Sequence, residues 1–343
     1  MKKTYFLIAF LVLSSVKLIA QVTDVIDGLN GPAGILLNGN DLYIAEGLGI
    51  SKINTTDTSP SKTNVTTRLV APFEMVLHGN EMYFTQGRKI SKINITATTP
   101  IVATDVVTGL NYPSSLVLNG NDLYIAERDK ISQIDITATT PIVTEVITSL
   151  SNPSSMIIIG DDLYVAEGGN RIFKTNLNSP TPMVTDVIIG LNMPSAMILD
   201  GNNLYVAESG DGIISKINIT ETNPTAIEIV NGLDRPLGLA INGNDLYISD
   251  NGTRKIYKFD LNTLSTGKLI DLPNLKLSPN PASDFIQISG LNRAENYTIY
   301  NCLGDKVNTG VISAKQKTDI KNLSSGMYFI QFKNRNTIKF LKE

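Results

Sequence analysis

A unit of about 40 residues is repeated six times along this 343-residue chain. Each unit contains an apolar residue followed by a tyrosine, and these tyrosines are Tyr43, Tyr83, Tyr124, Tyr164, Tyr205 and Tyr247. Successive tyrosines are 40, 41, 40, 41 and 42 positions apart. Such a regular repeat predicts copies of one supersecondary unit, each packed against its neighbours.

Each unit has the pattern of four β-strands without helical periodicity. In the third unit the predicted strands are residues 114–118, 123–127, 130–136 and 141–148. The first strand of a unit is apolar on both sides, as at residues 156–159, so it must be covered on both faces. Four strands in about 40 residues are typical of a β-propeller blade, and six units predict a six-bladed β-propeller. A parallel β-helix would need a shorter period, and a β-sandwich would not repeat its turns six times.

A glycine-containing turn follows the first strand of every unit. The turn pairs are Asn38-Gly39, His78-Gly79, Asn119-Gly120, Ile159-Gly160, Asp200-Gly201 and Asn242-Gly243. Asn-Gly is the preferred central pair of a type I′ hairpin, which needs two residues with positive φ. We therefore expect type I′ turns with these pairs at their centres.

The strand that closes the ring has two candidates. Residues 22–29 (VTDVIDGL) nearly duplicate residues 184–191 (VTDVIIGL), which form the fourth strand of a unit, yet they precede the first unit. We expect residues 22–29 to pair with residues 255–261 in the last blade and so cover an open sheet edge. Residues 268–272 compete for the same place.

Residues 236–241, 244–250 and 254–260 resemble the strands of NHL-type propeller repeats. The resemblance extends over residues 22 to about 272 and includes the six-bladed superfamily of gluconolactonases and strictosidine-synthase-like proteins. It implies the propeller fold. It does not imply one function, because that fold hosts lyases, lactonases and binding proteins.

The composition changes after Leu272, and residues 275–343 predict a separate β-domain. Alternating apolar positions in residues 284–288, 297–303 and 328–333 favour a small β-sandwich with one core.

This segment resembles the type A C-terminal sorting domain of the type IX secretion system of Bacteroidetes-type bacteria. The matching residues are Pro279-Asn280-Pro281, Ile299-Tyr300-Asn301 with Gly304 and Val307, Asp319-Ile320 with Leu323, residues 325–328 and the basic residues 339–342. One departure is Asn301-Cys302, where the family commonly has a more acidic turn. The resemblance implies the type IX secretion machinery as a partner, with the domain removed after export or used for surface attachment.

The first twenty residues have the pattern of a secretory signal peptide. Lys2 and Lys3 precede an apolar run at residues 5–13, and Ala20 before Gln21 is a plausible cleavage point. The run is too short to span a bilayer comfortably.

We therefore expect a signal peptide (1–20), a propeller (21–272), a linker (273–276) and a sorting domain (277–343). No transmembrane segment is expected after signal removal, and the protein would pass the periplasm to be secreted or displayed on the cell surface.

Composition excludes several functions. The net charge of −3 and the isoelectric point of about 5.4 argue against a nucleic-acid partner. The chain has one histidine, His78, which we interpret as a turn residue, and one cysteine, Cys302. These counts exclude an ordinary zinc site and disfavour a Ser-His-Asp or Cys-His hydrolase.

A ring of five carboxylates and one amide is the one candidate site. Three residues after each repeat tyrosine stand Glu46, Gln86, Glu127, Glu167, Glu208 and Asp250. Equivalent positions of a propeller lie at one end, where clustered carboxylates could hold a divalent cation such as calcium. Basic residues that could pair with them instead are Arg88, Lys89, Arg128, Arg171 and Arg254. We favour the structural interpretation, in which the ring closes hairpins and no cofactor is required.

The loops are short and nearly uniform, and the Pro-Ser pairs at 113–114, 153–154 and 194–195 predict innermost strands close to the axis. Enzymes on this fold carry unequal loops that build a pocket, because function is carried by loops. We expect a non-catalytic binding module for a glycan, peptide or protein. The alternative is a metal-assisted lactonase or lyase that uses the carboxylate ring.

Overall fold

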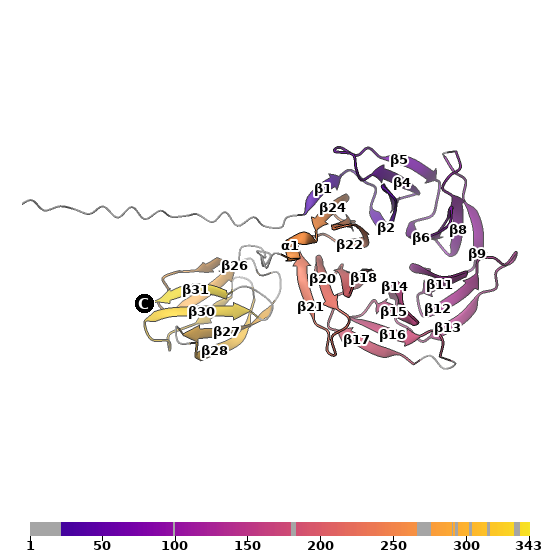
Figure 1. Cartoon of the computed structure of the whole chain (residues 1–343). Coiled ribbons are helices and arrows are strands. Elements are labelled where there is room, and N and C mark those ends of the chain that lie inside the picture. The colour runs from indigo at the N-terminus through magenta and orange to yellow at the C-terminus, as the bar shows by residue number, and fades with distance from the viewer. Residues whose placement is uncertain are drawn as a thin grey trace, which may run out of the picture.

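The computed structural model describes residues 22–98, 100–179, 183–265, 276–289, 291, 294–301, 304–313, 316–332 and 337–343. The expected signal peptide therefore lies outside the described residues. Six four-stranded antiparallel sheets form a ring around a central axis (Figure 1). This confirms the six-bladed β-propeller. We number the blades 1 to 6 along the chain.

The strands of each blade follow one another outward from the axis. Blade 1 contains β2 (Pro32–Asn38), β3 (Asp41–Glu46), β4 (Gly49–Asn54) and β5 (Thr63–Thr67). Blade 2 contains β6 (Pro72–His78), β7 (Glu81–Gln86), β8 (Lys89–Asn94) and β9 (Thr104–Thr108). Blade 3 contains β10 (Ser115–Asn119), β11 (Asp122–Glu127), β12 (Lys130–Asp135) and β13 (Thr144–Thr148). Blade 4 contains β14 (Pro153–Ile159), β15 (Asp162–Glu167), β16 (Arg171–Asn176) and β17 (Thr185–Ile189). Blade 5 contains β18 (Pro194–Asp200), β19 (Asn203–Glu208), β20 (Ile213–Asn218) and β21 (Ala226–Val230). Blade 6 contains β22 (Pro236–Asn242), β23 (Asp245–Asp250), β24 (Lys255–Asp260) and β1 (Thr23–Ile26).

The first strand of the chain closes the ring. β1 pairs antiparallel with β24, and Thr23 lies opposite Lys258. The prediction that residues 22–29 complete the last blade is therefore confirmed. The competing residues 268–272 lie outside the described part of the chain.

The propeller core lies between the blades. One buried cluster combines Leu42 and Ile44 of blade 1 with Tyr247 and Ile256 of blade 6. Each blade is covered on both faces by its neighbours, which explains why the inner strands are apolar on both sides.

The hairpin turns differ from the expected type. Asn38 pairs with Asp41, so Gly39 and Asn40 form the central pair of the turn instead of Asn38-Gly39. Gly39 has a φ of 58°, while Asn40 is absent from the residues with positive φ. A positive φ at the first central residue alone is the pattern of a type II′ turn, which places glycine there. The same register holds in all six blades, so the expectation of type I′ turns is wrong.

The Pro-Ser pairs join neighbouring blades near the axis. Ser114 donates a 2.5 Å hydrogen bond to the carbonyl of Pro153, Ser154 donates one of 2.5 Å to Pro194, and Ser195 donates one of 2.6 Å to Pro236. Each acceptor lies at the start of the next blade's innermost strand. The predicted position of these pairs is therefore confirmed.

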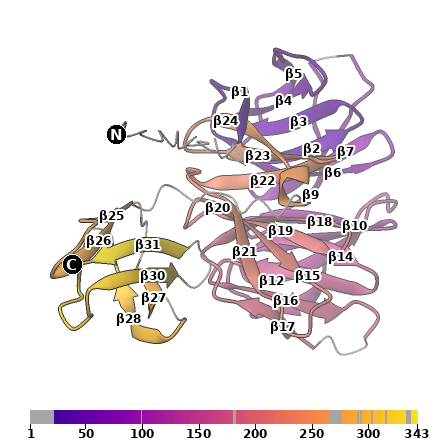
Figure 2. The same ribbon diagram turned by 60° about the vertical axis from the view of Figure 1, so that its left-hand side comes forward.

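The C-terminal domain is a small β-sandwich, shown from a second direction in Figure 2. One sheet has the order β25-β26-β29 and the other β28-β27-β30-β31. The strands are β25 (Lys276–Ser278), β26 (Phe285–Ser289), β27 (Glu295–Asn301), β28 (Lys306–Ile312), β29 (Lys317–Asp319), β30 (Gly326–Phe332) and β31 (Thr337–Lys342). Its core includes Ile286 and Ile299, one from each sheet, and contains no propeller residue.

The only helix in the described residues is α1 (Asn262–Ser265), a single turn after the last blade. Across the same residues, no helix has the length and apolar character needed to cross a membrane.

Candidate functional site

The six ring residues occupy one position in six blades. Each is the last residue of its blade's second strand, so all lie at the same end of the propeller, here called the ring end. All are buried: Glu46, Gln86, Glu127, Glu167, Glu208 and Asp250 have exposed fractions between 0 and 7%. A buried carboxylate must be hydrogen-bonded or paired.

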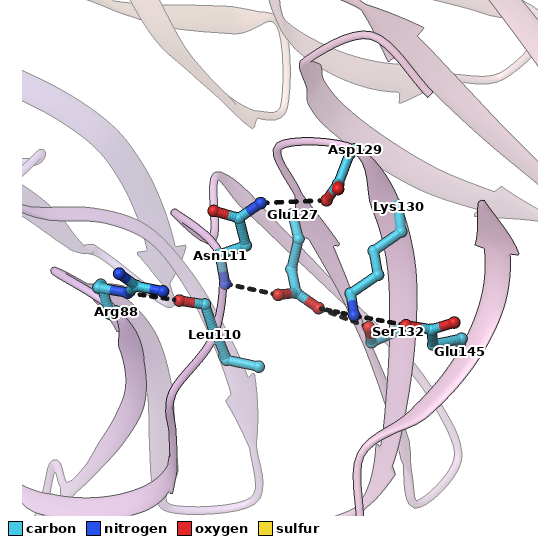
Figure 3. A network of polar contacts seen from close by, with 8 residues as sticks. All are labelled: Arg88, Leu110, Asn111, Glu127, Asp129, Lys130, Ser132 and Glu145. Atoms are coloured by element: carbon cyan, nitrogen blue, oxygen red, sulfur yellow. Dashed lines mark hydrogen bonds and ion pairs between the residues drawn. The ribbon is translucent and has the colours of Figure 1, made fainter. Parts of the chain in front are cut away.

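Glu127 of blade 3 shows how this requirement is met (Figure 3). Its Oε2 accepts a 2.6 Å hydrogen bond from the backbone N–H of Asn111, which lies in the crossover loop entering the blade. Its Oε1 accepts a 2.5 Å hydrogen bond from the hydroxyl of Ser132 on the third strand. Lys130 lies 3.9 Å from the same oxygen. Both carboxylate oxygens therefore have donors from within the blade and its entry loop.

The crossover contact recurs in every blade and always joins residues sixteen positions apart. The backbone donors are Asn30 to Glu46 (2.8 Å), Val70 to Gln86 (3.0 Å), Asn111 to Glu127 (2.6 Å), Ser151 to Glu167 (2.6 Å), Asn192 to Glu208 (2.8 Å) and Asp234 to Asp250 (2.7 Å). We expected these side chains to close hairpins. In blades 1, 2, 3 and 5 they do so, because each bonds a serine of the third strand, and in all six blades they also hold the crossover loop.

In blades 1, 3 and 5 the second oxygen accepts a hydrogen bond from the equivalent serine of the third strand. Ser51 donates to Glu46 at 2.5 Å, and Ser215 donates to Glu208. In blade 4 the guanidinium of Arg171 donates to Glu167 at 2.6 Å. Of the five basic residues expected to pair with the ring, Arg171 does so in the described structure. Lys89, for example, forms its ion pair with Asp105 at 2.8 Å.

The charge state of Glu46 follows from these contacts. Burial alone would raise the pKa of this carboxyl, but hydrogen bonds from the Asn30 backbone, Ser51 and Lys62 outweigh it and lower the pKa below its usual value. Glu46 is therefore held as an anion with its own donors.

These contacts bear on the metal interpretation. The described residues contain no group of three or more His, Cys, Asp or Glu side chains placed to hold a metal ion. Each ring carboxylate faces donors of its own blade, so the arrangement favours the structural interpretation of the ring. Binding of calcium there stays a prediction of the alternative function.

A second contact fixes each crossover loop to the preceding blade. A leucine N–H in each loop donates to a carbonyl of that blade's turn between its second and third strands. The pairs are Leu29 to Arg254, Leu69 to Leu48, Leu110 to Arg88, Leu150 to Asp129, Leu191 to Asn170 and Leu233 to Gly212, at 2.9–3.1 Å. The next residue donates to the ring side chain, a carboxylate in five blades and the Gln86 amide in blade 2, so two consecutive N–H groups fix the loop between two blades.

In all six crossover loops, the residue after these two N–H donors has a left-handed backbone and precedes the proline at the start of the repeat. These residues, which we call the rim, are Gly31, Ala71, Tyr112, Asn152, Met193 and Arg235, with φ between 45° and 64°. Tyr112 is 61% exposed and Met193 is 54% exposed. Sequence reasoning missed the rim, although the sequence contains a signal for it. That signal is a variable residue before a proline in an otherwise uniform repeat.

Glu74 is a further acidic residue that sequence reasoning missed. It lies on β6, the innermost strand of blade 2, where the other blades have Gly34, Ser115, Ser155, Ala196 and Gly238. Its Oε1 accepts a 3.1 Å hydrogen bond from the N–H of Met75. Burial raises the pKa of Glu74 to about 7 in spite of that hydrogen bond. The protonation of this carboxyl therefore changes near neutral pH.

The comparisons with known proteins divide the chain in the same way. Residues 276–343 match the family of secretion system C-terminal sorting domains. No curated protein matches the sequence significantly. Solved structures match the propeller at identities too low to show more than the fold.

Three of those structures illustrate the range. Virginiamycin B lyase from Staphylococcus aureus has 17% identity and a TM-score of 0.52, covering 70% of this chain and 98% of that one. The PQQ-bound aldose sugar dehydrogenase from Streptomyces coelicolor has 14% identity and a TM-score of 0.56, covering 70% and 97%. A nidogen/laminin complex has 15% identity and a TM-score of 0.55, covering 65% and 90%.

The neighbours include enzymes and a protein complex, so the fold does not decide between catalysis and binding. The C-terminal match is informative about export, because such a domain directs a protein through the type IX secretion route to the surface or the medium. Residues 276–343 therefore belong to the secretion system C-terminal sorting domain family, and they follow a six-bladed β-propeller.

Proposed function

We propose that the propeller is a non-catalytic binding module that the sorting domain delivers to the cell surface or the medium, and that it binds a polypeptide ligand through the rim. The observation that carries the proposal is the contrast between six different rim side chains and the uniform hydrogen bonds that hold their loops, here called the frame. The frame repeats two hydrogen bonds in every blade, whereas the rim residue changes from glycine to arginine.

The rim backbone is preorganised. A left-handed conformation is unfavourable for a residue with a side chain, and it persists only where its surroundings fix it. At Tyr112 the fixing contacts are the N–H of Leu110, bonded to Arg88, and the N–H of Asn111, bonded to Glu127. A loop held in one conformation loses little entropy on binding, which favours affinity.

The rim side chains suit a polypeptide. Tyrosine, methionine and arginine are enriched in protein interfaces, and tyrosine and arginine are frequent hot spots. Tyr112, Asn152, Met193 and Arg235 belong to four successive blades, 3 to 6, while the residues of blades 1 and 2 are glycine and alanine. The binding face would therefore extend over blades 3 to 6.

A library of random phage-displayed peptides, panned against the chain from residue 21 to 343, tests this proposal. We expect selected peptides to bind wild type at least tenfold more tightly than the double variant Tyr112→Ala/Met193→Ala, because loss of two hot spots costs more than about 1.4 kcal/mol. The matched control is Ile142→Ala/Met183→Ala. It removes two side chains that are each 78% exposed and lie in loops between third and fourth strands, at the opposite end.

Unchanged affinity for the control variant and a loss for the rim variant would support the rim. If the rim variant binds the selected peptides as tightly as wild type does, or if no peptide is selected, binding through the rim is contradicted.

A further inference from the structure

Blade 1 contains a surface pocket of about 340 Å³ at the ring end, beside Glu46. Its lining includes Leu48, Gly49, Lys62 and Arg68. The volume lies at the small end of the range for small-molecule sites. Because the propeller repeats one unit six times, the equivalent positions of the other blades show what this pocket replaces.

Gly49 replaces a basic side chain. The residue at the start of the third strand is Lys89, Lys130, Arg171 and Lys255 in blades 2, 3, 4 and 6. Each forms an ion pair with an acidic residue of the outer strand, namely Asp105, Glu145, Asp186 and Asp24, at 2.5–2.8 Å. Blade 1 has Gly49 and Asn64 at the two positions, so both charges are absent, and a side chain at Gly49 is excluded because its Cβ would lie 2.5 Å from the backbone carbonyl oxygen of Thr66.

Thr66 replaces an apolar side chain. It lies opposite Ile50, where the equivalent residues are Val107, Ile147, Ile188 and Val230. Thr66 also lines the pocket and is 1% exposed, and its hydroxyl has no hydrogen-bond partner among the described residues. A buried polar atom without a partner is costly, and each such atom in a folded protein calls for a physical explanation. Thr66 is therefore a buried polar group without a partner in the wall of the pocket.

Arg68 replaces glycine. It has a φ of 63°, and the equivalent residues with positive φ are Gly28, Gly109, Gly190, Gly232 and Ser149. A long side chain in this conformation is strained, and such strain is found preferentially at functional sites. No described residue forms an ion pair or hydrogen bond with the Arg68 guanidinium. Lys62, in contrast, is already 3.0 Å from Glu46.

These departures define the chemistry of an occupant. A guanidinium binds a carboxylate through two parallel hydrogen bonds. The Asn64 amide and the Thr66 hydroxyl can each donate and accept, which suits hydroxyl groups. Leu48 is 65% exposed and offers an apolar surface beside them. We infer that the blade 1 pocket binds a small acidic sugar, a hydroxylated ring that carries one carboxylate, as in a uronic acid.

Titration of the chain from residue 21 to 343 with D-glucuronate, followed by ligand-observed NMR, tests the inference. We expect saturable binding of D-glucuronate and at least tenfold weaker binding of D-glucose and acetate, since each lacks half of the recognised groups. Arg68→Gln should weaken glucuronate binding about tenfold. The matched control is Arg254→Gln, which removes an exposed arginine with a φ of 61° that does not line the pocket.

Thr66→Val is a second variant that keeps the test independent of folding defects. It installs the residue of blades 2 and 5 and removes the unpartnered hydroxyl, so we expect a higher melting temperature together with weaker glucuronate binding. The inference does not rest on the rim, and Tyr112→Ala/Met193→Ala should bind glucuronate as wild type does. No binding of glucuronate to wild type, equal binding of acetate, or unchanged binding by Arg68→Gln would each overturn the inference.

Discussion

The backbone N–H of Asn111 donates a 2.6 Å hydrogen bond to Glu127, sixteen residues later in the chain. The bond joins the loop that enters blade 3 to the end of that blade's second strand. Its repetition in all six blades means that the acidic ring holds the crossover loops in place. The rim residues then follow directly after a fixed point.

This contact predicts different costs for two substitutions of Glu127. Glu127→Gln keeps an acceptor for the Asn111 N–H, and its amide can donate to Ser132 as Gln86 donates to Ser91 at 2.7 Å. We expect it to lower the free energy of unfolding by about 1 kcal/mol or less. Glu127→Ala leaves the N–H and the hydroxyl without partners and should cost about 2–4 kcal/mol. Denaturant unfolding measures both, and equal costs would contradict the role of the side chain as an acceptor.

Removal of residues 22–29 should destabilise the propeller. The deletion exposes the outer edge of β24 and removes Leu29, which is 2% exposed between blades 6 and 1. We expect the melting temperature to fall by roughly 10 °C, from a loss of about 3–5 kcal/mol. Asp24→Ala is the control, because it removes only an exposed ion pair with Lys255 and should cost about 1 kcal/mol or less. An unchanged melting curve of the deletion variant would show that β1 does not close the ring.

Glu74 should make stability depend on pH near neutrality. Its pKa is about 7 in the folded chain against a reference of 4.5, so between these values the folded state binds more protons than the unfolded state. Stability should therefore fall as pH rises from 4.5 to 7 and then level off. Because the side chain is partly exposed, we expect a smaller effect on stability than the full pKa shift would give. Relative to wild type, the free energy of unfolding of Glu74→Gln should rise by about 2 kcal/mol between pH 5 and pH 8. Parallel pH profiles for the two proteins would contradict the raised pKa.

Removal of residues 276–343 should block export and leave the propeller folded. The core of the C-terminal sandwich contains no propeller residue, so the deletion removes an independent unit. We expect the truncated protein to accumulate in the periplasm with an unchanged propeller melting transition. Cell fractionation and thermal unfolding check the two halves of this prediction. Normal levels of truncated protein at the surface or in the medium would contradict the sorting role.

Several features of the fold could be predicted because the sequence repeats them. The spacing from Tyr43 to Tyr247 predicted six blades, and the likeness of residues 22–29 to residues 184–191 predicted the closing strand. The turn type could not be predicted in this way. Asn38-Gly39 and Gly39-Asn40 are both acceptable turn pairs, and only the pairing of Asn38 with Asp41 distinguishes them.

The candidate site was predictable in position but not in its contacts. Periodicity placed Glu127 at the end of its strand, but its partner Asn111 lies in a loop whose path depends on two blades. The blade 1 pocket depends on departures from the repeat at Gly49, Thr66 and Arg68. These positions can be aligned between blades only when the strand register and its bulges are known.

Calcium titration tests most directly whether the ring braces the blades or holds a metal. The melting temperature of the chain from residue 21 to 343 is measured against calcium concentration for wild type and for Glu127→Gln/Glu167→Gln/Glu208→Gln. If the carboxylates only hold crossover loops, calcium should leave both melting temperatures unchanged. A ligand that binds the folded state raises stability with its concentration. A calcium-dependent rise in wild type that the triple variant lacks would therefore contradict the account and support the metal-assisted enzyme.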